Sequence, residues 1–380
     1  MRRASDADRE RLNATFAALC RIESPSGRER ECADRVTAEL RGLGLAVDED
    51  DAGAAVGSDA GNLLARLPGA RPQSILMCAH LDTVPPLAPI DPVVVDGGWE
   101  NAHEGILGAD NKAAIAVLIE LARRFAGASE RPPVGLELLF TVSEENGLRG
   151  AKAFDATRLS SEFGYVFDHA SPIGGIVLAA PTYDGIVAVL RGRAAHAGIR
   201  PEQGRSAIAA AARAIAATAL GRLDDETTAN VGTIAGGTAM NVVPERCRIE
   251  AEVRGLDTLR VEQVVTEIVD HLHDAANEGE CDLDVTVERH FQGYRSKPSA
   301  PHIVAAGRAL QACGYEPRHF ATGGGSDANA FQAAGLPCAN LADGTERNHE
   351  PGERISIDAL EGMLEVAISL LDAAAEVLPG

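Results

Sequence analysis

His80 and Asp82 close the stretch Ser74 to Pro85 (SILMCAHLDTVP), in which a run of apolar and small residues leads straight into the histidine. Such an unbroken run is typical of a strand buried on both faces. Polar groups are costly at the end of a buried strand unless they have a use, and ligands bind beyond the carboxyl ends of strands in open α/β sheets. We therefore expect His80 to bind a metal and Asp82 to hold its ring in place.

Acidic or imidazole side chains follow three more predicted core strands. These strands and their polar residues are 134–142 with Glu144 and Glu145, 163–167 with Asp168, and 336–341 with His349. Two adjacent carboxylates repel each other unless a cation or a proton intervenes. A single example would suit an ordinary surface loop, but the repeated pattern favours one shared site.

Asp110 opens the predicted helix of the segment GADNKAAIAVLIELARRF. Two interpretations are open for this residue. Its carboxylate suits the exposed N–H groups and the dipole of a helix N-terminus, so it could be an N-cap. Its carboxylate would equally serve as a metal ligand beside the strand ends.

Two imidazoles and three carboxylates make up the predicted ligand set, which is His80, Asp110, Glu145, Asp168 and His349. Mixed nitrogen and oxygen ligands suit zinc, and also cobalt or manganese. Five protein ligands fit two divalent metal ions about 3.5–4 Å apart if one carboxylate bridges them. Glu144 is the predicted general base, which takes a proton from metal-bound water. The expected reaction is hydrolysis of an amide bond.

The elements around these residues predict an α/β domain interrupted by a second domain. From about Gly185 the segments read β-α-β-β-α-β, which is the order of a ferredoxin-like sandwich. We expect a catalytic domain in two parts, 1–179 and 292–380, and an inserted lid domain at 180–291. The stretch from Pro86 to Leu107 is predicted to be irregular.

Composition excludes some classes of partner. The chain has 380 residues and a net charge of −21, which argues against nucleic acid or an anionic membrane as a partner. We find no window of about 18 apolar residues and no signal peptide. The seven cysteines are scattered without a CxxC pair, which favours free thiols and a cytoplasmic protein.

The motifs HLDTVP, GADNK and SEEN, followed by the Asp168 strand end, resemble the M20 family of co-catalytic metallopeptidases over nearly the whole chain. The segments AHAGIRPEQGRSAIAAAA, MNVVPE and EAEVRG look like the peptidase T-like branch of that family. The resemblance implies a zinc-peptidase-type domain with a mixed central β-sheet flanked by helices, and an inserted ferredoxin-like α+β lid. It also implies an aminopeptidase that acts on di- or tripeptides.

The resemblance also implies a role for each ligand. One metal would be held by His80, Asp110 and Asp168. The other would be held by Asp110, Glu145 and His349, so that Asp110 bridges the two metals. Asp82 would orient His80, and Glu144 would be the base.

The family's substrate-binding residues match positions mainly in the lid. His196 matches a histidine that, in dimeric members, reaches into the partner's site, so a homodimer through the lid is expected. Asn241 and Arg254 match residues that hold the substrate carboxylate, and an Arg fork suits a carboxylate. A loop matched by Gly324, Gly325 and Ser326 would line the substrate site.

Other substrates remain open. Carboxypeptidases, N-acyl-amino-acid amidohydrolases and deacetylases of the family would use the same machinery, and all their substrates carry a carboxylate. Gly255 follows Arg254 where Ser is more usual, which leaves the specificity undecided. A non-catalytic binding protein on this scaffold would have lost a ligand or the base, and this sequence retains both.

Overall fold

The computed structural model describes residues 3–126 and 131–379. The chain forms two compact units. The first unit ends at Ala179 and resumes at Ser296, and the second unit, called here the inserted unit, spans Ala180–Arg295. Each unit has its own hydrophobic core.

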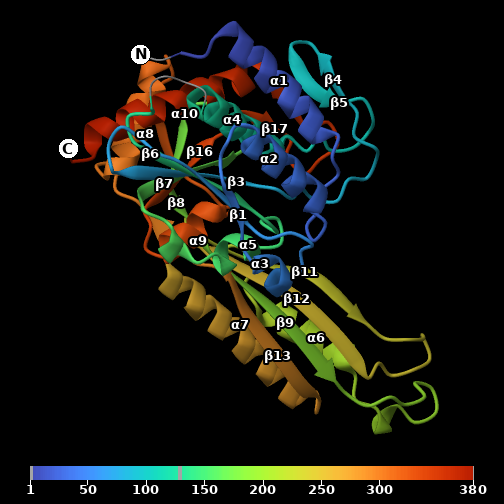
Figure 1. The fold of residues 1–380 in the computed structure, drawn as a ribbon. Helices are drawn as coiled ribbons and strands as arrows, with labels where there is room; N and C mark the ends of the chain where they lie inside the picture. Colours follow the sequence, from blue (N-terminus) through green and yellow to red (C-terminus); the bar gives the residue numbers. More distant parts are fainter. Residues whose placement is uncertain (1–2, 127–130, 380) are drawn as a thin grey trace. The chain divides into compact units, whose positions relative to one another are not determined.

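The first unit contains a large mixed sheet, a small sheet and the helices that cover them (Figure 1). Its helices are α1 (Asp6–Cys20), α2 (Arg30–Gly42), α3 (Ala52–Val56), α4 (Ala109–Ala126), α5 (Arg149–Ala153), α8 (Pro301–Ala312), α9 (Asp327–Ala333) and α10 (Ile357–Val377). The strands of the large sheet are β1 (Val47–Glu49), β2 (Leu63–Leu67), β3 (Ser74–His80), β6 (Gly135–Thr141), β7 (Ser161–His169), β8 (Gly175–Ala180), β15 (Arg318–Ala321) and β16 (Cys338–Ala342).

The large sheet runs in the order β1-β2-β6-β3-β7-β16-β8, with β15 beside β8. Its centre, β6-β3-β7-β16, is parallel, so these strands end at one edge of the sheet. Every residue of β3 and β6 is buried. Helix α4 packs on β3 and β7, and α9 contacts β7 and β16 from the other face (Figure 1). This arrangement confirms the predicted mixed α/β sheet. Apolar strands of this kind need cover on both faces, and helices provide it here.

A small antiparallel sheet corrects the prediction that 86–107 is irregular. It runs in the order β17-β18-β5-β4. Its strands are β4 (Pro92–Val95), β5 (Gly98–Asn101), β17 (Thr345–Glu346) and β18 (Arg354–Ser356). The prediction failed because each strand is very short, and because β5 is stabilised by β18, which lies some 250 residues away in the chain. Local sequence carries little signal for such long-range pairing.

The inserted unit has the predicted β-α-β-β-α-β order. Its main elements are β9 (Thr182–Arg191), α6 (Ala207–Ala217), β11 (Thr227–Gly236), β12 (Arg246–Gly255), α7 (Thr258–Glu278) and β13 (Asp282–Phe291), with short strands β10 (Gly221–Arg222) and β14 (Tyr294–Arg295). The sheet order is β10-β11-β12-β9-β13, and α6 and α7 cover its buried face. This is the ferredoxin-like arrangement that the strand order predicted.

In the part of the chain that the structure describes, no helix is both long enough and apolar enough to cross a membrane.

Candidate metal centre

The parallel strands bring the predicted ligands to one edge of the large sheet. His80 is the last residue of β3 and pairs with Thr141, the last residue of β6. The turn after β6 therefore places Glu144 and Glu145 beside His80. On the other side of β3, strand β7 carries Asp168 near its carboxyl end.

Among the described residues, three sets of three side chains have ligand atoms within 4.8 Å of one another, and two of these sets contain Asp110. The first is His80, Asp110 and Asp168, and the second is Asp110, Glu145 and His349. Asp110 Oδ1 lies 3.2 Å from His80 Nε2, and Asp110 Oδ2 lies 3.2 Å from His349 Nε2. The two oxygens of one carboxylate thus face two separate groups.

The interpretation of Asp110 as a simple helix cap is not supported. Asp110 has φ −82° and ψ 104°, an extended conformation that N-cap residues also adopt, so its side-chain contacts must decide the question. Its carboxylate contacts His80, His349 and the side-chain amide of Asn348, which donates to Oδ2 at 2.9 Å. The carboxylate therefore faces the ligand cluster.

His349 lies at the tip of a hairpin. Strands β17 and β18 pair in antiparallel fashion, and the loop between them carries the histidine. Its Nε2 atom lies 2.9 Å from Glu145 Oε1. The side chain is half exposed, whereas His80 is buried. One imidazole thus lies at the base of the centre and the other at its rim.

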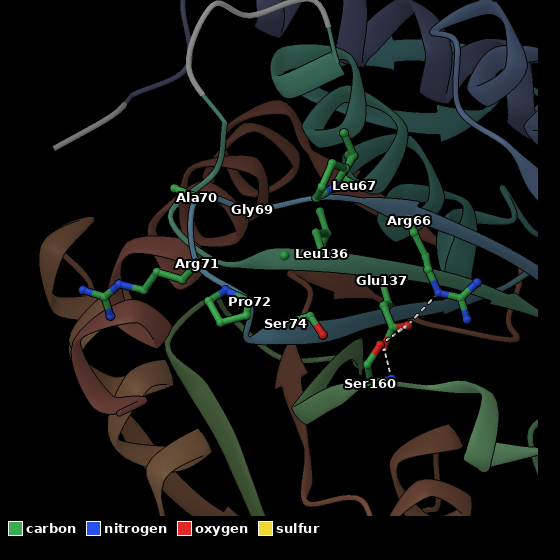
Figure 2. Close-up of a pocket in the computed structure, with 12 residues that line it drawn as sticks. Arg66, Leu67, Gly69, Ala70, Arg71, Pro72, Ser74, Leu136, Glu137 and Ser160 are labelled. Atoms are coloured by element: carbon green, nitrogen blue, oxygen red, sulfur yellow. Dashed lines mark hydrogen bonds and ion pairs between the residues drawn. The ribbon is translucent and has the colours of Figure 1, made fainter. Parts of the chain in front are cut away.

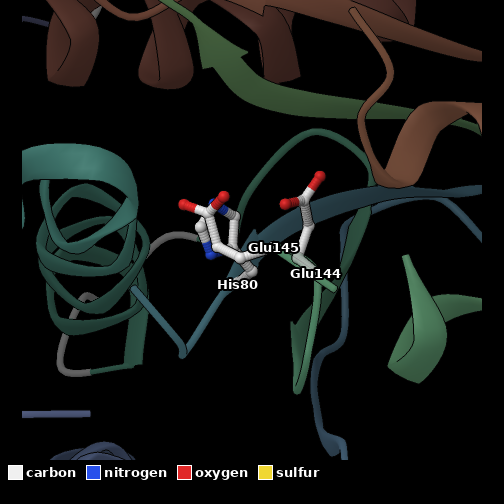
Figure 3. A group of neighbouring side chains, drawn as sticks. All are labelled: His80, Glu144 and Glu145. Carbon is white, nitrogen blue, oxygen red and sulfur yellow. The ribbon is translucent and has the colours of Figure 1, made fainter. Parts of the chain in front are cut away.

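Glu144 lies next to the ligands and is buried. Figure 3 shows its carboxylate beside His80 and Glu145, and these three side chains also have ligand atoms within 4.8 Å of one another. Burial raises the pKa of Glu144 well above its ordinary value, and the charge of Asp168 raises it further. The role of Glu144 as the general base remains a prediction.

Asp82 contacts His80, as its predicted role in orienting the ring requires, but mainly through its backbone. The nearest acceptor for His80 is the backbone oxygen of Asp82, to which His80 Nδ1 donates at 2.9 Å. The carboxylate of Asp82 lies farther away, at 3.5 Å. It accepts instead from the backbone N–H groups of Glu144 (2.9 Å) and Glu145 (3.1 Å) and from Ser26 Oγ (2.6 Å). The residue fixes the tautomer of His80 through its main chain, and its side chain holds the adjacent turn.

The electrostatics of the cluster are set by carboxylates and imidazoles in direct contact. Burial would raise the pKa of Asp110, but hydrogen bonds from His349 and His80 lower it below its ordinary value. Contacts with Asp110 and Glu145 raise the pKa of His349 to about 10. Contacts with the two imidazoles thus offset part of the negative charge of the carboxylates. A divalent cation would take over this compensating role.

Several buried polar residues around the centre were not predicted. Glu353 accepts hydrogen bonds from three backbone N–H groups of the segment that leads into Asp110. Asn340 exchanges two hydrogen bonds with the backbone of Asp168, at 3.1 and 3.0 Å. Asn111 donates to the backbone oxygen of Phe167 at 2.7 Å. In the sequence, Glu353 stands out only as an acidic residue four positions after His349. The residues that it contacts lie more than 240 positions away, so their pairing with it could not be predicted.

A cavity of about 460 Å³ lies at the opposite end of the strands (Figure 2). It is lined by Ser74 and Gly135, which begin β3 and β6, and by Arg66 and Glu137. Glu137 is satisfied by Arg66 at 2.9 Å and by the backbone and hydroxyl groups of nearby serines. The charged side chains Arg66 and Glu137 of this cavity thus pair with each other, unlike the convergent side chains at the carboxyl edge.

The predicted substrate residues of the inserted unit do not lie together. His196 forms a β-bridge with Val242, and Ala197 N–H donates to the Asn241 oxygen at 2.9 Å, so His196 and Asn241 are neighbours. Asn241 precedes the start of β12, whereas Arg254 is near its end. Eight residue steps along a strand span roughly 26 Å. Asn241 and Arg254 of one copy of the chain are therefore too far apart to bind the same carboxylate, and their roles in substrate binding remain predictions.

The remaining predicted residues lie before α9. Gly324 N–H donates to Thr322 Oγ1 at 3.2 Å, and Ser326 N–H donates to Asn329 Oδ1 at 3.1 Å. Ser326 is buried at the start of the helix. These bonds order the loop, and its predicted contact with substrate remains a prediction.

Family models match both units. The model of the M20 peptidase dimerisation domain matches residues 184–280, and the model of peptidase family M28 matches residues 62–171. The chain is 34% identical over 368 residues to the uncharacterized protein YqjE of Bacillus subtilis, covering 97% of this chain and 99% of that protein.

Solved structures give similar matches. Aminopeptidase PepT from Bacillus cereus is 37% identical, with a TM-score of 0.88, and a tripeptidase from Staphylococcus aureus is 32% identical, with a TM-score of 0.91. Each match covers 97% of this chain and 99% of the other.

Proposed function

Because the chain belongs to the peptidase T-like branch of the M20 peptidase family, we propose that it is a dinuclear metal-dependent aminopeptidase acting on di- or tripeptides. The observation that carries the proposal is the position of Asp110, whose two carboxylate oxygens face His80 and His349 separately. A carboxylate placed in this way suits a bridge between two cations.

The ligand residues fit two divalent ions. The ion-pair partners of Asp110, Asp168 and Glu145 in this cluster are all imidazoles. His80 donates from Nδ1 to the Asp82 backbone oxygen, so a neutral His80 would offer its Nε2 atom, 3.2 Å from Asp110 Oδ1, to a metal. Zinc is the proposed metal because it accepts this mixture of nitrogen and oxygen ligands, as cobalt and manganese also do. When bound, the two ions would polarise the scissile carbonyl and make a water molecule more acidic.

The chain's own residues would supply proton transfer and positioning. Glu144 would accept a proton at its carboxylate from the attacking water and pass it to the leaving amine. Asp82 would hold the Glu144 backbone in place through the hydrogen bond to its N–H. The burial of both side chains would keep bulk water away from the proton as it moves.

Substrate recognition would involve a second copy of the chain. His196 and Asn241 lie together but far along the sheet from Arg254. We assign His196 and Asn241 to the partner's site and Arg254 to the chain's own site. The exposed apolar side chains Ile199, Ile234 and Met240 support an interface near this end of the inserted unit. The match to a dimerisation domain is in agreement with this assignment.

The proposed location is the cytoplasm. All seven cysteines are free thiols, five of them buried. Free buried thiols are typical of proteins from reducing compartments.

A substrate panel tests the activity. The purified protein would be loaded with Zn²⁺, Co²⁺ or Mn²⁺ and assayed on Ala-Ala-Ala, Ala-Ala, N-acetyl-Ala-Ala and N-acetyl-alanine. We expect hydrolysis of the peptides with a free amino end and loss of activity with a chelator. Turnover of only the acylated compounds would instead identify an amidohydrolase or carboxypeptidase.

A further inference from the structure

We infer that Glu353 is a positioning residue that fixes the bridging Asp110 relative to His349. This inference rests on the proposed function, because it assumes that Asp110 and His349 bind metal. It adds a residue that touches no metal ligand atom and acts through the main chain of the segment that carries Asp110.

Three hydrogen bonds join Glu353 to that segment. Glu353 Oε2 accepts from the N–H groups of Leu107 (2.9 Å) and Gly108 (2.8 Å), and Oε1 accepts from the N–H group of Asp110 (2.9 Å). The Glu353 side chain is buried, at 1% exposure. An ionised carboxylate that accepts several backbone N–H bonds in a buried site forms strong, charge-assisted contacts.

The segment needs such support because it has no regular structure of its own. Leu107 and Gly108 precede α4, Gly108 has φ +75°, and the backbone of Asp110 is not helical. The three N–H groups therefore have no helical carbonyl as a partner. Without Glu353 they would be buried and unsatisfied, which is costly.

The small sheet holds Glu353 itself in place. Glu353 directly precedes β18, in which Ile355 is buried and pairs with Trp99 of β5. Arg354 adds an ion pair to Glu100 at 3.2 Å. The same strand closes the hairpin whose tip carries His349. Glu353 thus connects the hairpin that supplies one ligand to the segment that supplies the bridging ligand.

The backbone conformation of the hairpin also indicates that surrounding contacts hold His349 in place. Arg347 and His349 both have positive φ, at 57° and 67°. Such conformations cost free energy and persist only where surrounding contacts enforce them. Glu353, four residues beyond His349, is one of the contacts that anchor this loop to the rest of the unit.

The main test is metal binding by Glu353→Gln. The substituted side chain has nearly the same shape, but its NH₂ group must face either Asp110 N–H or the N–H groups of Leu107 and Gly108. It therefore loses at least one bond in either orientation. We expect Zn²⁺ affinity, measured by competition with a chelator, to fall by about 10- to 100-fold, and mainly for the ion held by Asp110, Glu145 and His349.

Glu346→Gln is the matched control. Glu346 lies on the same hairpin and loses the same charge, but its side chain is exposed. We expect its Zn²⁺ affinity to stay within about twofold of the parent protein. The Co²⁺ absorption spectrum provides a second readout, which should change for Glu353→Gln and not for Glu346→Gln.

Stability is measured separately, by thermal unfolding of the metal-free proteins. If Glu353→Gln fails to fold, Glu353→Asp replaces it, because a shorter carboxylate keeps the charge but cannot reach all three N–H groups. The Glu353→Asp protein should also show weaker metal binding. Equal affinities of the folded variant and the parent would overturn the inference. A parent protein that binds no pair of ions would instead overturn the proposed function.

Discussion

At the scale of single residues, buried carboxylates at the centre have separate tasks that their partners define. Asp110 faces imidazoles, so its oxygens are available to cations. Asp82 and Glu353 face backbone N–H groups, and their carboxylate oxygens accept hydrogen bonds from these groups. Glu144 has a raised pKa and is assigned to proton transfer. Residue type alone does not separate these tasks.

Replacement of Glu144 by Gln tests the proposed base. Gln has the same size but cannot accept a proton, so we expect kcat to fall by about 10²- to 10⁴-fold. Metal content, measured by atomic absorption, should equal that of the parent because Glu144 belongs to neither proposed ligand set. Loss of one ion in this variant would show that Glu144 is a ligand, as its place beside His80 and Glu145 would permit.

At the scale of elements, the turn between β6 and α5 must be held firmly because it carries both Glu144 and Glu145. The backbone folds back tightly, and Gly150 N–H donates to the Val142 oxygen at 3.0 Å. Asn62 reinforces the contact by accepting from Val142 N–H and donating to the Gly150 oxygen. The close approach requires a residue without a side chain at position 150.

Gly150→Ala tests this close approach. A Cβ atom at Gly150 would lie 2.1 Å from the Val142 oxygen and 2.7 Å from Asn62 Oδ1. We expect the variant to lose about 1–3 kcal/mol in free energy of unfolding, measured by urea denaturation. Gly42→Ala is the control, since a Cβ there would meet nothing within 4 Å. An unchanged stability of Gly150→Ala would mean that the turn can relax.

At the scale of the whole molecule, the predicted substrate residues of the inserted unit lie in two separate places. The inserted unit separates His196 and Asn241 from Arg254 along β12 by a distance far longer than a side chain. A two-fold dimer would supply the missing residues in both sites at once.

Mixing two inactive variants tests whether His196 acts on the partner's site. Neither Glu144→Gln nor His196→Ala should be active alone. After subunit exchange, a mixed dimer contains one site with both residues intact, so an equal mixture should recover about a quarter of the parent activity. Recovery would be measured on the best peptide of the panel. No recovery, despite exchange verified by mass spectrometry, would place His196 in its own chain's site.

The sequence by itself determined the kind of sheet and which polar side chains gather at its carboxyl edge. Apolar runs that end in His80, Glu144–Glu145 and Asp168 predicted neighbouring strand ends, and the structure brings these residues together. This prediction succeeded because the signal is local: a buried strand has a recognisable composition, and a polar residue at its end stands out. The β-α-β-β-α-β order of the inserted unit could also be predicted, because each of its strands and helices has a recognisable local pattern.

Only the tertiary structure decided how the ligands are held. The hydrogen bonds of Asp82 to the Glu144–Glu145 turn, and those of Glu353 to the segment before Asp110, join residues 62 to 246 positions apart. The small sheet that anchors Glu353 also depends on strand pairing. Such contacts leave no periodicity or composition in the chain, because the partners meet only after the strands have paired.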